Sequence, residues 1–297
     1  MEGVFYVMPT PFDGAQQIDR PGISSLVEFA IRSSAAGIVI LGVTGEASKL
    51  SDPEKLEVVG QVVKDVRRRT PVVVGVGNPS EEVAAWLGSE IKKLGGDALM
   101  VLPPKMTDED ALARYYGTVS DSAGLPIVVQ DEPATSGTFL SVSAIERICR
   151  RLGDAPSLKL EDPPTPRKIR RIRERVGRSP KIFGGIGGQY FLYELESGGD
   201  GIMTGFAYPE ILVKIYRLYR DGDRAEAADV FFRSLPLIQY EAQPQAGLAI
   251  RKYALHRRGV LPNPSLRKPA VELDEQDRAL FETVLKRTAG QLPWLTP

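Results

Sequence analysis

The chain has 297 residues, of which 42% are hydrophobic and 26% charged, as in an ordinary globular protein. Its 38 basic and 38 acidic residues cancel, whereas nucleic-acid-binding proteins usually carry a clear basic excess. The single histidine, His256, argues against a catalytic triad or a multi-histidine zinc site, and its basic surroundings predict a surface position. The single cysteine, Cys149, cannot form an internal disulfide, which fits a reducing compartment, and we interpret it as a core residue.

The beginning of the chain does not resemble a targeting segment. Residues 3–8 form an apolar run that is too short for a signal peptide and has no basic segment before it. No apolar run reaches the roughly 18 residues that a membrane span requires. These features predict a cytoplasmic protein with neither a nucleic acid nor a membrane as its partner.

Short apolar runs alternate along the chain with longer amphipathic segments. Most of the runs are continuous, as at 38–41, and continuous runs are typical of parallel strands buried on both faces. The predicted strands are 4–8, 37–41, 71–76, 98–102, 126–129, 157–160, 181–183 and 201–204.

The segments between these runs carry apolar residues three and four positions apart, which is the spacing of helices. One helix is predicted to begin at Asp52, a candidate N-cap, followed by Pro53, and others begin near Ser80 and Thr107. Strand–helix units repeated in this way over about 215 residues predict a (β/α)8 barrel. An open doubly wound sheet is the alternative.

The strand pattern stops after Asp221. Helices are predicted at 224–237, 247–258 and 275–288, with a proline-containing stretch at 261–264. We therefore expect residues 1–221 to form the barrel and residues 222–297 to form a helical extension packed on it.

Lys159 is the most conspicuous residue near the end of a predicted strand, where (β/α)8 barrels carry their functional side chains. It interrupts the apolar run between Leu158 and Leu160. If it points inward, its desolvated amine becomes a nucleophile that can form a Schiff base with a 2-keto acid. The alternative is a lysine that reaches solvent from the strand end. Glu161 lies on the same face of the strand as Lys159.

Nucleotide-binding signatures fail in this chain. Residues 75–80 and 184–188 lack the GxGxxG spacing, and 42–49 lacks the glycine–lysine pair of a P-loop. The segment 184–188, which includes Gly185, still follows a strand and precedes a helix. Its amides could bind an anion, or it could form only a tight turn.

Three motifs together resemble those of the dihydrodipicolinate synthase and N-acetylneuraminate lyase family. They are Thr-Pro-Phe at 10–12, Gly-x-Thr-Gly-Glu at 42–46 and the lysine in the sixth strand, and the resemblance continues through 199–205. It implies a class I Schiff-base lyase or aldolase on a (β/α)8 barrel with three C-terminal helices. It also implies that Lys159 forms the imine, and that Thr44 and the amide of Gly45 hold the substrate carboxylate.

The departures from the family pattern bear on the substrate. The family's fifth-strand motif, Tyr-Asn-x-Pro-x-Arg-Thr-Gly, aligns with 130–137, so Gln130 replaces the catalytic tyrosine and Thr135 the substrate-binding arginine. Val43 replaces the first threonine of the family's Thr-Thr-Gly-Glu. An amide cannot pass a proton as a phenol does, so the family's proton relay is absent and dihydrodipicolinate synthase activity is not expected.

Three side chains are candidates to replace that relay. Glu161 could reach the site if its strand continues, Tyr208 offers a phenol after the eighth strand, and Gln130 could position a water or a substrate hydroxyl. The alternatives are that Glu161 pairs with an arginine and that Tyr208 only packs. The predicted site comprises catalytic Lys159, Gln130, Glu161 and Tyr208, with Thr44, Gly45, Val43, Thr10 and Gly185 binding substrate; no metal and no cofactor is expected.

The leading hypothesis is a Schiff-base-forming lyase that acts on pyruvate or a 2-keto-3-deoxy sugar acid, as a dehydratase or an aldolase. The segment 130–137 is similar to that of keto-deoxy-sugar-acid dehydratases in the family, which slightly favours the dehydratase. A second hypothesis is a catalytically reduced barrel that binds a keto acid as a sensor or scaffold. The resemblance further predicts a homo-oligomer, a dimer or a tetramer.

Overall fold

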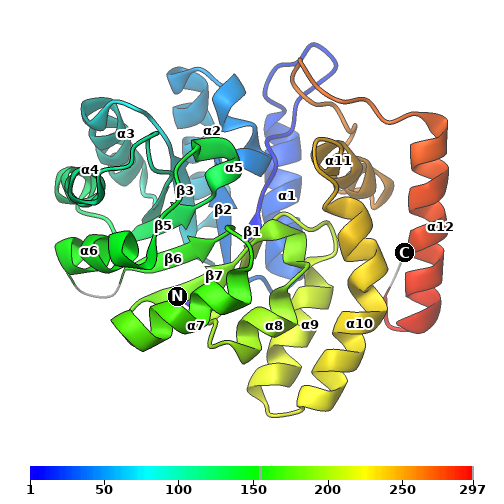
Figure 1. The fold of residues 1–297 in the computed structure, drawn as a ribbon. Helices are drawn as coiled ribbons and strands as arrows, with labels where there is room; N and C mark the ends of the chain where they lie inside the picture. Colours follow the sequence, from blue (N-terminus) through cyan, green and yellow to red (C-terminus); the bar gives the residue numbers. More distant parts are fainter. Residues whose placement is uncertain (154–155, 296–297) are drawn as a thin grey trace.

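A computed structural model describes residues 1–153 and 156–295 of the chain. In this part of the chain, parallel strands pair in sequence order and close into a barrel, in which β8 also pairs with β1 (Figure 1). The (β/α)8 prediction is confirmed, and the open-sheet alternative is wrong. The strands are β1 (Gly3–Val7), β2 (Gly37–Ile40), β3 (Val72–Val76), β4 (Ala98–Val101), β5 (Ile127–Asp131), β6 (Ser157–Leu160), β7 (Lys181–Gly184) and β8 (Gly201–Thr204).

Helices connect the strands and surround the barrel (Figure 1). They are α1 (Arg20–Arg32), α2 (Asp52–Val66), α3 (Glu81–Leu94), α4 (Glu109–Ala123), α5 (Pro133–Ser136), α6 (Val142–Leu152), α7 (Thr165–Val176), α8 (Phe191–Glu196) and α9 (Pro209–Arg220). Three short 3₁₀ turns of the described chain follow strands β2 and β7: η1 (Val43–Gly45), η2 (Ala47–Lys49) and η3 (Ile186–Gly188).

The predicted end of the fifth strand is too early. β5 continues through Gln130 and Asp131, because these residues still pair in register with Lys159 and Leu160 of β6. Their side chains are polar, which is typical of loops, although their backbone belongs to the sheet. Gln130 therefore lies on a rigid strand and not in a flexible connection.

The N-cap of α2 also differs from the prediction. Ser51 and not Asp52 caps this helix: its hydroxyl accepts the amide proton of Glu54, and the Glu54 carboxylate accepts the amide proton of Ser51. This reciprocal arrangement is a capping box, and it satisfies two backbone donors that would otherwise have no partner. Asp52 occupies the first helical position, where a negative charge is favourable.

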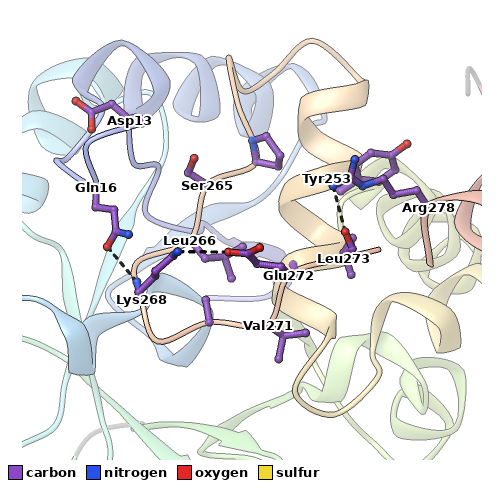
Figure 2. Close-up of a pocket in the computed structure, with 14 residues that line it drawn as sticks. Asp13, Gln16, Tyr253, Ser265, Leu266, Lys268, Val271, Glu272, Leu273 and Arg278 are labelled. Carbon is purple, nitrogen blue, oxygen red and sulfur yellow. Dashed lines mark hydrogen bonds and ion pairs between the residues drawn. The ribbon is translucent and has the colours of Figure 1, made fainter. Parts of the chain in front are cut away.

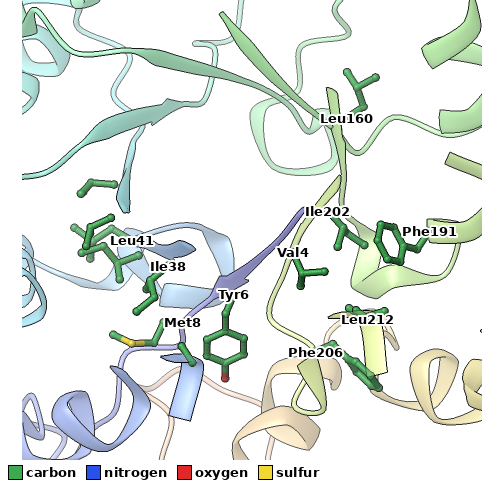
Figure 3. Packing of buried hydrophobic residues seen from close by; sticks show 14 of the residues in the cluster. Val4, Tyr6, Met8, Ile38, Leu41, Leu160, Phe191, Ile202, Phe206 and Leu212 are labelled. Carbon is green, nitrogen blue, oxygen red and sulfur yellow. The ribbon is translucent and has the colours of Figure 1, made fainter. Parts of the chain in front are cut away.

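Both faces of the barrel strands are buried, which explains why their apolar runs are continuous. Val4 and Tyr6 of β1 and Ile202 of β8 point outward and pack with Phe191 of α8 and Leu212 of α9 (Figure 3). The alternate, inward-facing residues fill the centre of the barrel as a second cluster: Phe5, Val7, Val39, Val73, Ala98, Met100, Val128, Phe183 and Met203.

The C-terminal helices α10 (Arg224–Glu241), α11 (Gly247–Arg257) and α12 (Glu275–Gln291) lie on one side of the barrel (Figure 1). α10 packs on α9, and α12 packs on α10. The predicted helices are confirmed, although α10 passes through Pro236 and ends later than expected. The boundary at residue 221 stays a prediction, and residues 296–297 of the predicted extension lie outside the described residues.

Across residues 1–153 and 156–295, no helix combines the length and the apolar character that a membrane crossing requires.

Candidate active site

Lys159 faces the interior of the barrel. Its neighbours on β6, Leu158 and Leu160, belong to the outward-facing cluster, and Lys159 itself pairs in register with Phe183 of the inner cluster. Only 7% of its side chain is exposed. The amine is therefore largely removed from water, as a Schiff-base lysine requires.

Glu161 and Gln130 gather around Lys159. The Nζ atom of Lys159 lies 2.8 Å from Oε2 of Glu161, and Nε2 of Gln130 donates to the same oxygen at 3.1 Å. Glu161 reaches this position because strand pairing continues past β6: its amide donates to the carbonyl oxygen of Asp131 at 2.8 Å. A carboxylate thus lies within proton-transfer distance of the amine, and Glu161 pairs with Lys159 instead of with an arginine.

The glycine-rich turn after β7 holds the Glu161 carboxylate in place. The amide of Ile186 donates to Oε1 of Glu161 at 3.3 Å. A Cβ atom at Gly185 would lie 2.4 Å from that oxygen, so only glycine leaves room for the carboxylate. The anion against this turn is thus one of the protein's own side chains, which places Gly185 beside Glu161.

The loop after β2 is fixed by its own hydrogen bonds. The amide of Gly45 donates to the carbonyl oxygen of Gly42 at 2.9 Å, closing the 3₁₀ turn η1. Thr10, which is 2% exposed, donates its hydroxyl to the carbonyl oxygen of Gly45 at 2.6 Å. Thr10 therefore positions the Thr-Gly-Glu loop, and the Gly45 amide already has an acceptor within the chain.

Thr44 contacts a side chain from the C-terminal helices. Nη1 of Arg251, on α11, donates to Oγ1 of Thr44 at 3.2 Å, and Nε of the same guanidinium donates to Oε1 of Glu241 at 2.9 Å. Glu241 also accepts the amide proton of Ala207, at 2.9 Å for the closer oxygen. Burial raises the pKa of Glu241 to about 7, against the opposing effect of Arg251.

Val43, Gln130 and Thr135 line one cavity. Its volume is about 190 Å³, and Lys55 and Met100 also contribute to its wall. Lys159 is not in the wall itself but lies beside Gln130 in the sheet. The three positions at which the sequence departs from the family motifs are therefore neighbours in space.

Comparison with known proteins identifies the family of the chain. The model of the dihydrodipicolinate synthetase family matches residues 1–288. The chain belongs to that family. Its members are class I lyases and aldolases, which work through a lysine Schiff base.

Individual relatives of this dihydrodipicolinate synthetase family protein span almost its whole length. An L-2-keto-3-deoxyarabonate dehydratase of Azospirillum brasilense is 29% identical, over 96% of this chain and 94% of its own. A putative 2-dehydro-3-deoxy-D-gluconate aldolase of Escherichia coli is 27% identical, over 96% of each chain. The crystal structure of a dihydrodipicolinate synthase from Rhodopseudomonas palustris superposes with a TM-score of 0.91, at 32% identity and 97% coverage of each chain.

Tyr208 makes no described hydrogen bond to Lys159, Glu161 or Gln130. It is fully buried in the outward-facing layer with Phe206, and the guanidinium of Arg258 lies 4.5 Å above its ring. Burial raises the pKa of its phenol far above the ordinary value. Its hydroxyl makes no hydrogen bond to any described residue. The phenol is therefore not brought to the barrel mouth, and the packing alternative fits its surroundings.

The other residues singled out by type lie outside the site. His256 is exposed, as predicted. Cys149 is buried on α6, as predicted, and burial raises the pKa of its thiol to about 11. Within the described ranges, no group of three or more His, Cys, Asp or Glu side chains is arranged to hold a metal ion.

A larger pocket, of about 360 Å³, lies between the loop after β1, helix α11 and the segment that precedes α12 (Figure 2). Lys268 and Glu272 pair across its wall at 3.5 Å, and Gln16 accepts the amide proton of Lys268 at 3.2 Å. Both members of the Lys268–Glu272 pair are more than two-thirds exposed. None of the predicted site residues lines this pocket, so its size does not make it the active site.

Sequence reasoning missed Arg251 and Glu241. The available signal was two consecutive basic residues, Arg251 and Lys252, which lie in α11 between the buried residues Ile250 and Ala254. Two adjacent cations in an otherwise buried helix must have anionic partners. The spacing could not show which acids those partners are.

Proposed function

We propose that this protein is a Schiff-base-forming lyase that dehydrates a 2-keto-3-deoxy sugar acid, with Lys159 as the imine-forming residue. The observation that carries the proposal is the 2.8 Å pair of Lys159 and Glu161 at the inner face of the barrel. The buried amine is the nucleophile, and the carboxylate beside it is a base that can take and return its proton. An aldolase acting on pyruvate would use the same pair.

The reaction follows from this pair. The free amine of Lys159 attacks the keto carbon of the substrate, and the carbinolamine then loses water to give the imine. The imine withdraws electrons from C3, so that a C3 proton can leave and the C4 hydroxyl can then depart as water. Glu161 carries protons between the amine, the carbinolamine oxygen and the substrate. Hydrolysis of the imine finally restores Lys159.

Glu161 replaces the phenol that the family motif has at position 130. The hydrogen bond from Gln130 orients the carboxylate, and the Ile186 amide holds its second oxygen. Gln130 does not titrate near neutral pH and cannot pass the proton itself. Thr135 has no guanidinium to receive a second carboxylate of a substrate. The protein is therefore not a true dihydrodipicolinate synthase.

Thr44 is the proposed ligand of the substrate carboxylate. Its oxygen accepts a hydrogen bond from Arg251, so the hydroxyl proton remains available for another acceptor. The named relatives support the substrate class, since they include a keto-deoxy-sugar-acid dehydratase and a putative keto-deoxy-sugar-acid aldolase. A cytoplasmic location and a dimeric or tetrameric assembly belong to the same proposal.

The test is turnover of a panel of 2-keto-3-deoxy pentonates and hexonates, with products identified by mass. Loss of water from one member, together with a borohydride-trapped adduct of that substrate, is the expected result. Release of pyruvate from the panel would make the protein an aldolase. An adduct without turnover would favour the sensor or scaffold.

The same preparation should be assayed with pyruvate and aspartate semialdehyde, coupled to dihydrodipicolinate reductase. We expect only trace activity, because general acid–base help of about 10²–10⁴-fold and a cation for the second carboxylate are both missing. A kcat/KM on the order of 10⁴ M⁻¹s⁻¹ or higher would contradict the proposed substrate class.

A further inference from the structure

We propose that Arg251 is the cation that selects the substrate carboxylate, acting beside Thr44 at the barrel mouth. This inference rests on the proposed function for the identity of the ligand, a 2-keto acid. It assigns a role in recognition to helix α11, which lies outside the strand–helix units of the barrel. The side chain is mostly buried, with 12% of its surface exposed.

The guanidinium lies where three strand ends meet. Nη1 contacts Thr44, which follows β2, at 3.2 Å. A Cβ atom at Gly205, after β8, would lie 3.5 Å from Nη1, and one at Gly187, after β7, would lie 3.5 Å from Nη2. The C-terminal ends of the strands form the mouth at which barrel enzymes bind their substrates. The guanidinium is therefore part of that mouth.

The donors of Arg251 are only partly used. Nε is paired with Glu241 and one Nη1 proton with Thr44, while Nη2 donates to no described residue. Glu241 fixes the guanidinium at Nε, and the Ala207 amide in turn fixes the Glu241 carboxylate. A fixed guanidinium with a free edge matches the planar geometry of a carboxylate.

The site needs such a donor because the loop amide cannot supply it. The Gly45 amide, expected to bind the carboxylate, donates instead to the carbonyl oxygen of Gly42. Thr44 has one hydroxyl proton, which can satisfy only one of the lone pairs of a carboxylate. Arg251 adds charge and further donors at the same place. The carboxylate then bridges the Thr44 hydroxyl and the free edge of Arg251.

The test compares pyruvate with methyl pyruvate, whose ester carries no charge. Borohydride trapping and intact mass give the concentration of each compound that half-saturates the adduct. Arg251→Gln removes a charge-assisted donor. It should raise the half-saturating concentration of pyruvate by about tenfold to a hundredfold and leave the half-saturating concentration of methyl pyruvate nearly unchanged. Arg251→Lys should restore part of the preference. A merely structural role would change both compounds equally, which would overturn the inference.

Folding of the variants needs its own control, because Arg251→Gln leaves the buried Glu241 without its cation. The double variant Arg251→Gln with Glu241→Gln removes both charges and should show the same loss of carboxylate preference. Arg257→Gln on the same helix, where Arg257 pairs with Glu282 near the surface, is the matched control and should behave as wild type.

A second arm separates this inference from the proposed function. Lactate and lactamide cannot form an imine, and their binding can be measured by ligand-observed NMR. Lactate binding that Arg251→Gln weakens tenfold, combined with no borohydride adduct in the wild type, would support Arg251 and overturn the imine. Equal lactate binding by wild type and Arg251→Gln, or lactate binding no stronger than lactamide binding in the wild type, would overturn the role of Arg251.

Discussion

Among the residues that the structure describes, two buried lysine–glutamate pairs have different surroundings. Lys159 has 7% of its side chain exposed and one ion pair, to Glu161, among the described residues. Lys252 on α11 is fully buried and donates to Glu46 at 2.7 Å and to the carbonyl oxygen of Ser265 at 2.8 Å. Burial alone therefore does not mark a reactive lysine. The two lysines differ in how many partners bind the amine: Lys252 has two within the chain, whereas Lys159 has only Glu161 among the described residues.

The environment of Lys252 shows what a structural lysine requires. Its ammonium lies 4.6 Å above the ring of Phe12, and Glu46 is further held by Lys49 and by the amide of Arg267. Burial lowers the pKa of Lys252 to about 8, so a low pKa also fails to identify the nucleophile. This group fastens α11 to the loop that carries Thr44. It thereby fixes the helix that presents Arg251.

The largest effect is expected from Lys159→Ala. Removing the imine-forming amine should abolish the borohydride adduct with pyruvate and lower kcat by on the order of 10⁴-fold or more. Lys159→Arg keeps the charge beside Glu161 but cannot form the imine, and should be equally inactive. Intact mass after reduction is the measurement. An adduct that persists in either variant would reassign the nucleophile.

Lys252→Ala should have the opposite profile. It removes the fully buried cation beside Glu46 and leaves that carboxylate with only the partly exposed Lys49. The loss should cost up to about 3–5 kcal/mol of unfolding free energy, while the folded protein still forms the adduct. Chemical denaturation measures the loss. Lys93→Ala, which removes an exposed pair with Glu90, is the matched control and should change stability by less than about 1 kcal/mol. A similar loss in both variants would show that the Lys252 pair is no more structural than a surface pair.

Another buried carboxylate, Glu194 of α8, tests the comparison without a lysine. Its Oε1 accepts the hydroxyl proton of Thr165 at 2.6 Å, while Oε2 has no hydrogen-bond partner among the described residues. Burial raises its pKa from 4.5 to about 8. The folded state therefore binds more protons than the unfolded state between these values. Stability should fall as pH rises through this window and level off above it.

Glu194→Gln should remove that pH dependence. The slope contributed by one such group is at most about 1.4 kcal/mol per pH unit, and the variant should be more stable than wild type at pH 8. Denaturation curves from pH 5 to 9 measure the difference. Glu196→Gln, at an exposed position on the same helix, should leave the slope intact. An unchanged slope in Glu194→Gln would mean that this carboxylate is ionised throughout.

The local sequence was enough to predict the barrel strands and to single out Lys159 and Gln130. The strands could be predicted because most of them are continuous apolar runs, and Lys159 stood out because a charge interrupts the run at 157–160. Gln130 was found through its alignment, although its strand was predicted to end before it. Polar side chains at a strand end have the composition of a loop, and only pairing with β6 shows that the strand continues.

The contacts between Thr44 and Arg251 and between Glu46 and Lys252 could not be predicted in the same way. They join residues 207 and 206 positions apart, and no periodicity of either segment encodes the partner. The surroundings of Tyr208 could not be predicted for a related reason. Its place after β8 suggested the barrel mouth, but the side chain belongs to the outward-facing layer, where the Arg258 guanidinium lies over its ring.

The smallest effect concerns Thr44, which lies on the same loop as Glu46. Its hydroxyl should contact the substrate carboxylate equally in the ground state and in the transition state, since that group does not react. Thr44→Val should therefore raise KM about tenfold and change kcat much less. Thr44→Ser keeps the hydroxyl and should stay within about threefold of wild type. Steady-state kinetics on the substrate found in the panel separate the two constants. A fall in kcat larger than the rise in KM would instead place the hydroxyl in the proton transfers, and the reactive region would then extend from Lys159 and Glu161 across the mouth to Thr44.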